Sequence, residues 1–227
     1  MAAGPSRDAS RPGAEAPAGT QGGDAIPPLR IAVIGDSGRI PDHLAALAYE
    51  VGREIARHGA ILYSGGRDGI MAAASRGARE AGGLTVGILP GDDPRESNAW
   101  VDVPVTTGLG MEWRSLVLIH SADAVIMIGG GNGTLGELSA SYLNARPVVI
   151  LAGTGGWSDR IRQVAVDGRY VDHRRTVPLE FAATPAEAAA RAVRLGRQFR
   201  QRYFPGPARW TGAGEAGGGA GDVTAPA

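Results

Sequence analysis

The chain has 227 residues, of which 43% are hydrophobic, and this suffices for one α/β domain with a sizeable core. It carries 23 basic and 23 acidic residues, so its zero formal net charge provides no global field to attract nucleic acid or an anionic membrane. Cysteine is absent and every basic residue is arginine, which excludes disulfides, thiolate catalysis, Schiff-base chemistry and a phosphate-loop lysine.

The two ends of the chain differ in composition from its middle. Residues 1–28 and 205–227 are rich in small residues and proline, so we expect disordered tails on either side of one domain, residues 29–204. The N-terminal stretch lacks the apolar segment of a secretory signal, and no apolar run approaches the roughly 18–20 residues that span a bilayer. We therefore expect a cytoplasmic protein without a membrane or nucleic-acid partner.

Between these ends, short apolar runs alternate with helical patterns. The expected strands are residues 29–35, 60–66, 84–90, 100–106, 122–130, 146–153 and a last one near 176–181. The expected helices are residues 42–59, one ending near 81, 111–122, 134–145, 157–165 and 184–199. The run 100–106 alternates, which indicates a short or edge strand, whereas 122–130 has nothing polar after Asp123 and should be buried on both faces. The pattern predicts a single doubly wound, Rossmann-like α/β domain with a mainly parallel sheet and helices on both faces.

Three of the expected strands end in small residues, in the loops GDSG (35–38), SGGRDG (64–69) and GGGNGT (129–134). Parallel sheets bind ligands outside the carboxyl ends of their strands, where glycine amides and the start of the next helix favour an anion. Glycine is also common in such turns without any ligand, but three loops at one edge favour a phosphate site. The candidate ligand-binding residues are Gly35, Ser37, Gly65, Gly66, Gly130, Gly131, Asn132, Gly133 and Thr134.

Other patterns in these loops fit known motifs poorly. Gly131, Gly133 and Gly136 satisfy G-x-G-x-x-G, but they follow a late strand rather than the first, which disfavours an NAD dehydrogenase. The GDSG loop fails as a serine nucleophile elbow because Arg39 stands where a second glycine is required. The four histidines show no metal-ligand spacing, so no metal site is predicted.

Two charged residues are predicted to face the same sheet edge as the glycine loops. Arg114 and Glu137 each lie in the first turn of an expected helix, and arginine binds phosphate or carboxylate with two parallel hydrogen bonds. Structural alternatives remain open for both. Thr134 and Glu137 form a T-x-x-E capping-box pattern, in which the glutamate caps the helix, and Arg114 can pair with Glu112 at the surface.

The motifs MEWR (111–114) and GGGNGTLGE (129–137) resemble the core of a superfamily with two branches. The LOG-type phosphoribohydrolases carry M-x-x-R-K and P-G-G-x-G-T-x-x-E, and the molybdenum cofactor carrier proteins carry G-G-G-x-G-T. The resemblance runs from about Ile31 to Leu151. Ser115 stands in place of the LOG lysine and Gly129 in place of the LOG proline, and both departures favour the carrier-like branch.

The resemblance implies that Arg114 and Glu137 are catalytic and that the glycine loop binds the 5′-phosphate of a nucleoside monophosphate. The implied reaction hydrolyses the N-glycosidic bond to free base and ribose 5-phosphate and requires no cofactor. The alternative is a non-catalytic carrier of molybdenum cofactor or of a related phosphorylated pterin or nucleotide; a nucleotide-sensing module fits less well. The same resemblance implies a homo-oligomer, commonly a dimer.

Overall fold

The computed structural model describes residues 27–205, so the predicted tails lie almost wholly outside the described residues. Seven strands form one sheet in the order β4-β3-β2-β1-β5-β6-β7, and every neighbouring pair is parallel. The strands are β1 (Arg30–Gly35), β2 (Ile61–Ser64), β3 (Thr85–Leu89), β4 (Val103–Thr106), β5 (Ala124–Ile128), β6 (Val148–Leu151) and β7 (Glu180–Ala182). The predicted α/β class is confirmed, with a sheet that is parallel throughout.

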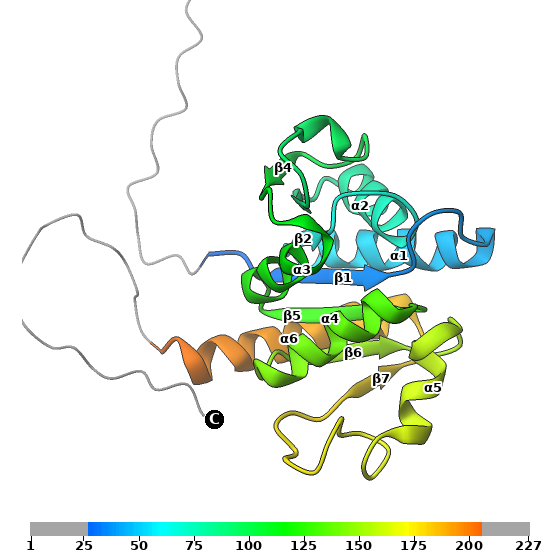
Figure 1. Ribbon diagram of the computed structural model, residues 1–227, viewed down its shortest axis with the longest axis vertical. Helices are drawn as coiled ribbons and strands as arrows, with labels where there is room; N and C mark the ends of the chain where they lie inside the picture. The colour runs from blue at the N-terminus through cyan, green and yellow to red at the C-terminus, as the bar shows by residue number, and fades with distance from the viewer. Residues whose placement is uncertain (1–26, 206–227) are drawn as a thin grey trace, which may run out of the picture.

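Helices cover both faces of this sheet (Figure 1). They are α1 (Asp42–Arg57), α2 (Ile70–Glu80), α3 (Gly110–Ser121), α4 (Asn132–Leu143), α5 (Gly156–Val164) and α6 (Pro185–Tyr203), with a short 3-10 helix η1 (Pro94–Glu96) before β4. Within residues 27–205, none of the helices combines the length and apolar character that crossing a bilayer requires.

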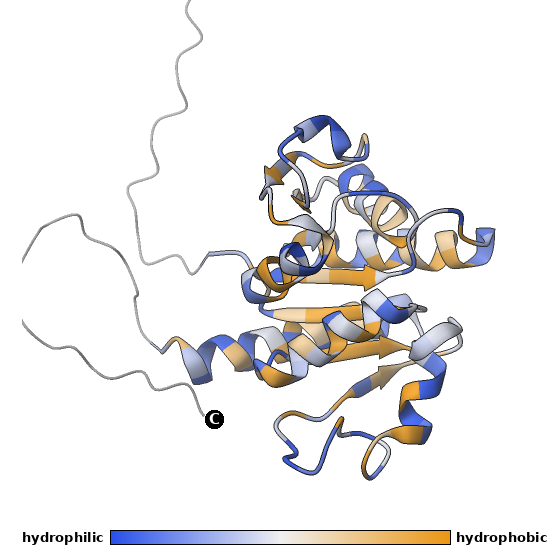
Figure 2. Cartoon of the chain, in the orientation of Figure 1, coloured by the Kyte–Doolittle hydropathy of each residue, from blue (hydrophilic) through white to orange (hydrophobic). Residues whose placement is uncertain are grey.

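Alternation along the strands divides the apolar side chains between two cores. Ile31 and Val33 of β1 pack in the core under α1, α2 and α6, while Ala32 and Ile34 pack in the core under α3, α4 and α5. The helices α1, α2, α5 and α6 each present one apolar stripe to the sheet. The hydrophobic colour concentrates in the strands and on the inner faces of these helices (Figure 2). All five residues of β5 are buried, as the uninterrupted apolar run predicted, and β4 is an edge strand with four exposed residues.

The start of α6 shows how local sequence sets a helix boundary. Thr184 is the N-cap residue, and its side chain accepts a hydrogen bond from the Glu187 amide at 3.2 Å. The Glu187 carboxylate reaches back to the Ala183 amide at 2.7 Å. Pro185 occupies the first helical position, where its fixed φ and missing N–H favour a helix start. The pattern T-x-x-E therefore acts as a capping box here.

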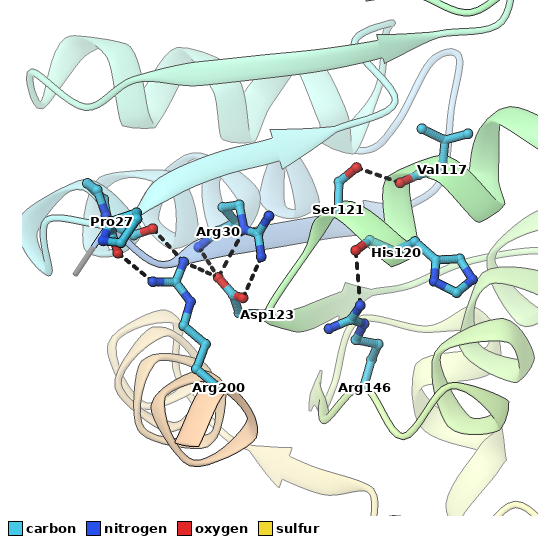
Figure 3. Close-up of polar contacts among 9 residues, drawn as sticks. Pro27, Arg30, Val117, His120, Ser121, Asp123, Arg146 and Arg200 are labelled. Atoms are coloured by element: carbon cyan, nitrogen blue, oxygen red, sulfur yellow. Dashed lines mark hydrogen bonds and ion pairs between the residues drawn. The ribbon is translucent and has the colours of Figure 1, made fainter. Parts of the chain in front are cut away.

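A buried ion cluster fastens the amino-terminal edge of the sheet (Figure 3). Asp123, which precedes β5 and is fully buried, accepts hydrogen bonds from the backbone amide of Arg30 at 2.8 Å and from its Nη2 at 2.9 Å. Arg200 of α6 donates to the same carboxylate at 2.5 Å and also to the carbonyl oxygens of Pro27 and Pro28. Desolvation opposes ionisation of Asp123, but the Arg200 and Arg30 hydrogen bonds outweigh it and hold the pKa of this carboxyl below its usual value.

Replacing Asp123 by alanine is expected to lower the free energy of unfolding by about 3 kcal/mol, because it removes the buried acceptor of the partly exposed Arg30 and Arg200 guanidinium groups and of the Arg30 amide. Because the pKa of Asp123 is lowered in the folded state, its carboxylate makes its full contribution to the free energy of unfolding at neutral pH. This contribution is lost as the pH falls below the usual aspartate pKa. Urea unfolding at pH 7 and pH 3 measures this difference, which should shrink at the lower pH. Asp93→Ala, at an exposed pair with Arg95, should change little. An equal loss for both variants would contradict the prediction.

Candidate functional site

A cavity of about 740 Å³ lies at the carboxyl edge of the sheet. Its floor includes the end of β1, which pairs with β2 on one side and with β5 on the other, so the strand order reverses here. Its walls come from α3 and from the first turns of α4. Open α/β sheets bind ligands at this kind of switch point, because the loops after the two central strands diverge and leave a crevice.

Most of the predicted site residues meet in this cavity. Those that line it are Gly35, Ser37, Gly65, Arg114, Gly131, Asn132, Gly133, Thr134 and Glu137. Gly66 and Gly130 do not line it, because the Gly66 amide donates to Ser64 Oγ at 3.1 Å and the Gly130 amide donates to Asp36 Oδ2 at 2.9 Å. The structure therefore does not bring Gly66 and Gly130 into the cavity with the other candidate ligand-binding residues.

The first glycines of the GGGNGT loop serve the fold rather than the cavity. Gly129 and Gly130 adopt left-handed φ angles of 63° and 104°, which favour glycine. Thr154 Oγ1 accepts the Gly129 amide at 2.9 Å, and Ser158 Oγ donates to the Gly129 carbonyl at 2.9 Å. With Asp36 on Gly130, these contacts fix the loop against β1 and α5. The GDSG loop contains Asp36, but nothing in the sequence indicated that its carboxylate holds Gly130, and no motif indicated Thr154 or Ser158, because all three are distant in the chain from the loop they hold.

The second half of the loop opens toward the cavity. The helix predicted from residue 134 begins two residues earlier, at Asn132, with Gly131 as its N-cap and no capping side chain. No hydrogen bond among residues 27–205 uses the backbone amides of Asn132, Gly133 or Thr134. These amides lie at the positive end of the helix dipole and therefore offer donors for an anion.

Arg114 is a buried cation without an acceptor. It lies in the second turn of α3, not the first as predicted, and it is only 3% exposed. In the part of the chain that the structure describes, its Nε and Nη1 have no hydrogen-bond partner, and Nη2 approaches only Met111 Sδ at 3.8 Å. Burial lowers the pKa of Arg114, opposed by the charge of Glu137 and reinforced by that of Arg67. The predicted alternative, a surface pair with Glu112, is wrong.

Gly65 leaves the space that the Arg114 guanidinium fills. A Cβ at position 65 would lie 2.0 Å from Arg114 Nη1 and 2.7 Å from Met71 Sδ. The sequence indicated only that Gly65 could offer its amide to a ligand. The structure adds that any side chain here would displace the arginine, because real Cβ atoms do not approach other atoms this closely.

Glu137 lies in the second turn of α4 and is half-buried in the cavity wall. Its Oε1 atom is 3.0 Å from Ser115 Oγ, and it accepts no backbone amide among the described residues. The capping-box alternative is therefore wrong, because the helix starts at Asn132 and carries Glu137 beyond its first turn. Burial raises the pKa of the Glu137 carboxyl, while the Ser115 hydrogen bond and the Arg114 charge oppose this rise.

The two charged residues line one cavity without being bonded to each other. Among residues 27–205, no hydrogen bond joins Arg114 to Glu137, and each keeps free hydrogen-bonding capacity. Unpaired N–H donors can hold an anionic ligand, and a neighbouring carboxyl of raised pKa can exchange a proton with it. Within the same residues, no group of three His, Asp or Glu side chains is placed to hold a metal ion.

These features define a parallel, Rossmann-like α/β protein whose carboxyl-edge cavity combines free helix amides, a buried arginine and a protonatable carboxyl. The chain belongs to the SLOG cluster4 family, whose family model matches residues 28–188. This match and the similarities below confirm the predicted membership of the superfamily that contains LOG phosphoribohydrolases and molybdenum cofactor carriers.

This chain is similar in sequence or structure to members of both branches. The X-ray structure of TM1055 is 44% identical, has a TM-score of 0.69 and aligns over 71% of this chain and 96% of its own. The molybdenum cofactor carrier protein of Chlamydomonas reinhardtii is 32% identical, with a TM-score of 0.63 over 74% of this chain and 98% of its own. A cytokinin riboside 5′-monophosphate phosphoribohydrolase of Mycobacterium tuberculosis is 36% identical over 49% of this chain and 65% of its own length.

Proposed function

We propose that this protein binds a nucleoside 5′-monophosphate in the carboxyl-edge cavity and hydrolyses its N-glycosidic bond to free base and ribose 5-phosphate. The observation that carries the proposal is the presence in one cavity of a buried, unpaired Arg114 and a separate, half-buried Glu137. The similarity to the M. tuberculosis phosphoribohydrolase supports the reaction class. The proposal requires no cofactor.

The free amides of Asn132, Gly133 and Thr134 and the guanidinium of Arg114 hold the anionic part of the substrate and fix its orientation. In the reaction, the bond from C1′ of the ribose to the base nitrogen breaks, and a water oxygen bonds to C1′. The base nitrogen keeps the bonding electrons and needs a proton, and the attacking water must lose one. Glu137 is the group in the cavity wall suited to this proton transfer and to stabilising the cationic sugar.

A product assay tests this function directly. The full-length protein is incubated with each of the common purine and pyrimidine nucleoside 5′-monophosphates and with an N6-substituted adenosine 5′-monophosphate, and released ribose 5-phosphate is measured. We expect turnover of at least one nucleotide and none of the matching nucleoside, because the phosphate supplies the anchoring contacts. Absence of ribose 5-phosphate from every nucleotide would contradict the proposal.

A second function, non-catalytic binding of a phosphorylated pterin such as molybdenum cofactor, is favoured by one observation in the loop. Gly129 has a φ of 63°, and a Cβ there would lie 2.5 Å from the Asp36 carboxylate. Proline, which has a φ near −65°, cannot adopt this conformation, so the loop excludes the LOG form of the motif. The similarity to the C. reinhardtii carrier over 98% of its length agrees with this alternative. Mass spectrometry of gently purified protein should detect a retained pterin if the protein is a carrier.

Gly65→Ala is expected to weaken nucleotide binding about tenfold, because the new methyl group displaces the Arg114 guanidinium and costs one well-placed charged hydrogen bond. Calorimetric titration with adenosine 5′-monophosphate measures the loss. Gly196→Ala is the matched control, since a Cβ at this buried glycine would make ordinary contacts of 3.4 Å or more. Equal affinities of the Gly65 and Gly196 variants would show that Arg114 does not depend on this space.

A further inference from the structure

The hydroxyl group of Ser115 on α3 forms a hydrogen bond to Glu137 on α4. Ser115 follows Arg114 on α3 and is half-buried in the wall of the cavity. Its Oγ lies 3.0 Å from Glu137 Oε1 and 3.2 Å from the carbonyl oxygen of Met111, one turn earlier in the same helix. A hydroxyl group has a single proton to donate but can also accept hydrogen bonds. Ser115 can therefore bond to Glu137 in two different ways.

The two ways correspond to the two protonation states of Glu137. When Glu137 is ionised, the Ser115 hydroxyl donates to the carboxylate. When Glu137 is protonated, the carboxyl donates to Ser115 Oγ and the hydroxyl proton turns to the Met111 carbonyl, which has two lone pairs. The exchange needs only a rotation of the hydroxyl proton, because all three heavy atoms already lie within hydrogen-bond distance.

We propose that Ser115 is a positioning residue that keeps Glu137 hydrogen-bonded in both protonation states, so that this carboxyl group acts first as an acid and then as a base. The inference rests on the proposed hydrolysis for its catalytic consequence. In the first half, Glu137 gives its proton to the departing base nitrogen as the bond from C1′ breaks. In the second half, the resulting carboxylate takes a proton from the water whose oxygen bonds to C1′. The cycle returns Glu137 to its protonated form and balances every proton.

The charges around Glu137 leave both states accessible. Arg114 on α3 favours the ionised form but makes no hydrogen bond to the carboxylate, and burial favours the neutral form and raises the pKa of Glu137. The other ionisable side chains that line the cavity are Glu112 on α3 and Asp36 after β1. Arg67, in the loop after β2, acts on Arg114 rather than on the carboxyl group. No cation is bonded to Glu137 among the described residues, so a neutral hydroxyl is its hydrogen-bond partner.

Three substitutions of Ser115 separate these effects. Ser115→Thr keeps the hydroxyl, Ser115→Ala removes it, and Ser115→Lys replaces it with a cation that can only donate. We expect the pKa of Glu137 to stay near the native value in the threonine variant, to rise in the alanine variant and to fall in the lysine variant. Carbon-13 NMR titration of the ligand-free protein with labelled glutamate carboxyl groups measures this, with the Glu137 signal assigned by its loss in Glu137→Gln.

The matched control is Ser121→Ala. Ser121 makes the same kind of bond one turn back, from its Oγ to the Val117 carbonyl at 2.7 Å, at the far end of the same helix (Figure 3). Its hydroxyl makes no hydrogen bond to a carboxylate among the described residues, so its replacement should leave the titration of Glu137 unchanged. A shift of the Glu137 signal in this control equal to that in Ser115→Ala would overturn the proposal.

Kinetics supply the second measurement. With a nucleotide that is turned over, Ser115→Ala should lower kcat about tenfold with little change in KM, while Ser115→Thr should retain activity. Ser115→Ala and Ser115→Lys should shift the pH profile of kcat in opposite directions. Identical titrations of Glu137 in the native, alanine and lysine proteins would overturn the role of Ser115. If the titrations shift as expected but no nucleotide is hydrolysed, the proposed hydrolysis fails while the bond between Ser115 and Glu137 stands.

Discussion

Replacing Glu137 by glutamine should lower kcat about a thousandfold while leaving nucleotide affinity within about threefold, because glutamine can still hydrogen-bond to Ser115 but cannot transfer a proton. The substitution preserves the shape of the side chain and so isolates the chemical role of the carboxyl group. Single-turnover release of ribose 5-phosphate, measured beside the dissociation constant, distinguishes a loss of chemistry from a loss of binding.

The same substitution should change stability in a direction that depends on pH. The pKa of Glu137 is raised in the folded protein, so its protonated carboxyl group favours the folded state. This stabilisation is present below the usual glutamate pKa and is lost as the pH rises through the pKa of the folded protein. Glu137→Gln should therefore raise the midpoint of thermal unfolding at pH 8 and change it little at pH 4. A variant with full activity, or one equally shifted at both pH values, would contradict the assigned role.

Replacing Arg114 by methionine should weaken binding of adenosine 5′-monophosphate by about a hundredfold, since each hydrogen bond to a charged group contributes about 1.5–3 kcal/mol. The free energy of unfolding should stay equal or increase, because the ligand-free protein keeps this cation buried without an acceptor. Calorimetric titration and urea unfolding of the same preparation measure both effects. A variant with native affinity would show that Arg114 does not hold the ligand.

Arg146 provides the control for this experiment. It is also buried, at 7% exposure, and its Nε and Nη1 likewise have no partner among residues 27–205. Its Nη2, however, donates to the His120 carbonyl at 3.0 Å, and its guanidinium lies 4.2 Å from the Phe199 ring centroid (Figure 3 shows the His120 contact). Arg146→Met should therefore lower the free energy of unfolding by about 1–2 kcal/mol and leave nucleotide affinity unchanged.

The pattern T-x-x-E occurs twice in this chain and has two different outcomes. At Thr184 it is followed by proline, which fixes the first helical position, and Glu187 reaches back to the start of the helix. At Thr134 it is preceded by glycines, which allow the helix to begin at Asn132 and carry Glu137 past the first turn. Local sequence could not decide between cap and site residue, because the helix start depends on how Asp36, Thr154 and Ser158 hold the loop.

The glycine loops show the same division between pattern and packing. Their positions after β1, β2 and β5 follow from the sequence, because buried strands separated by helices produce a parallel sheet with all carboxyl ends at one edge. The sequence could not predict which of these glycines face the cavity. The amides of Gly66 and Gly130 donate to Ser64 and Asp36 instead. The role of Gly65 depends on Arg114, which is 49 positions away in the chain and reaches it only in the folded protein.

The sequence by itself determined the fold class, and it predicted that Arg114 and Glu137 lie at the carboxyl edge of the sheet beside the glycine loops. Each of these follows from local periodicity, strand ends and short motifs, which act over a few residues. Only the tertiary structure decided that Arg114 is unpaired, that Glu137 contacts Ser115 rather than the helix start, and that Gly129 cannot be replaced by proline. The reason is physical: burial, desolvation and close contact depend on residues far apart in the chain that only the packed sheet and helices bring together.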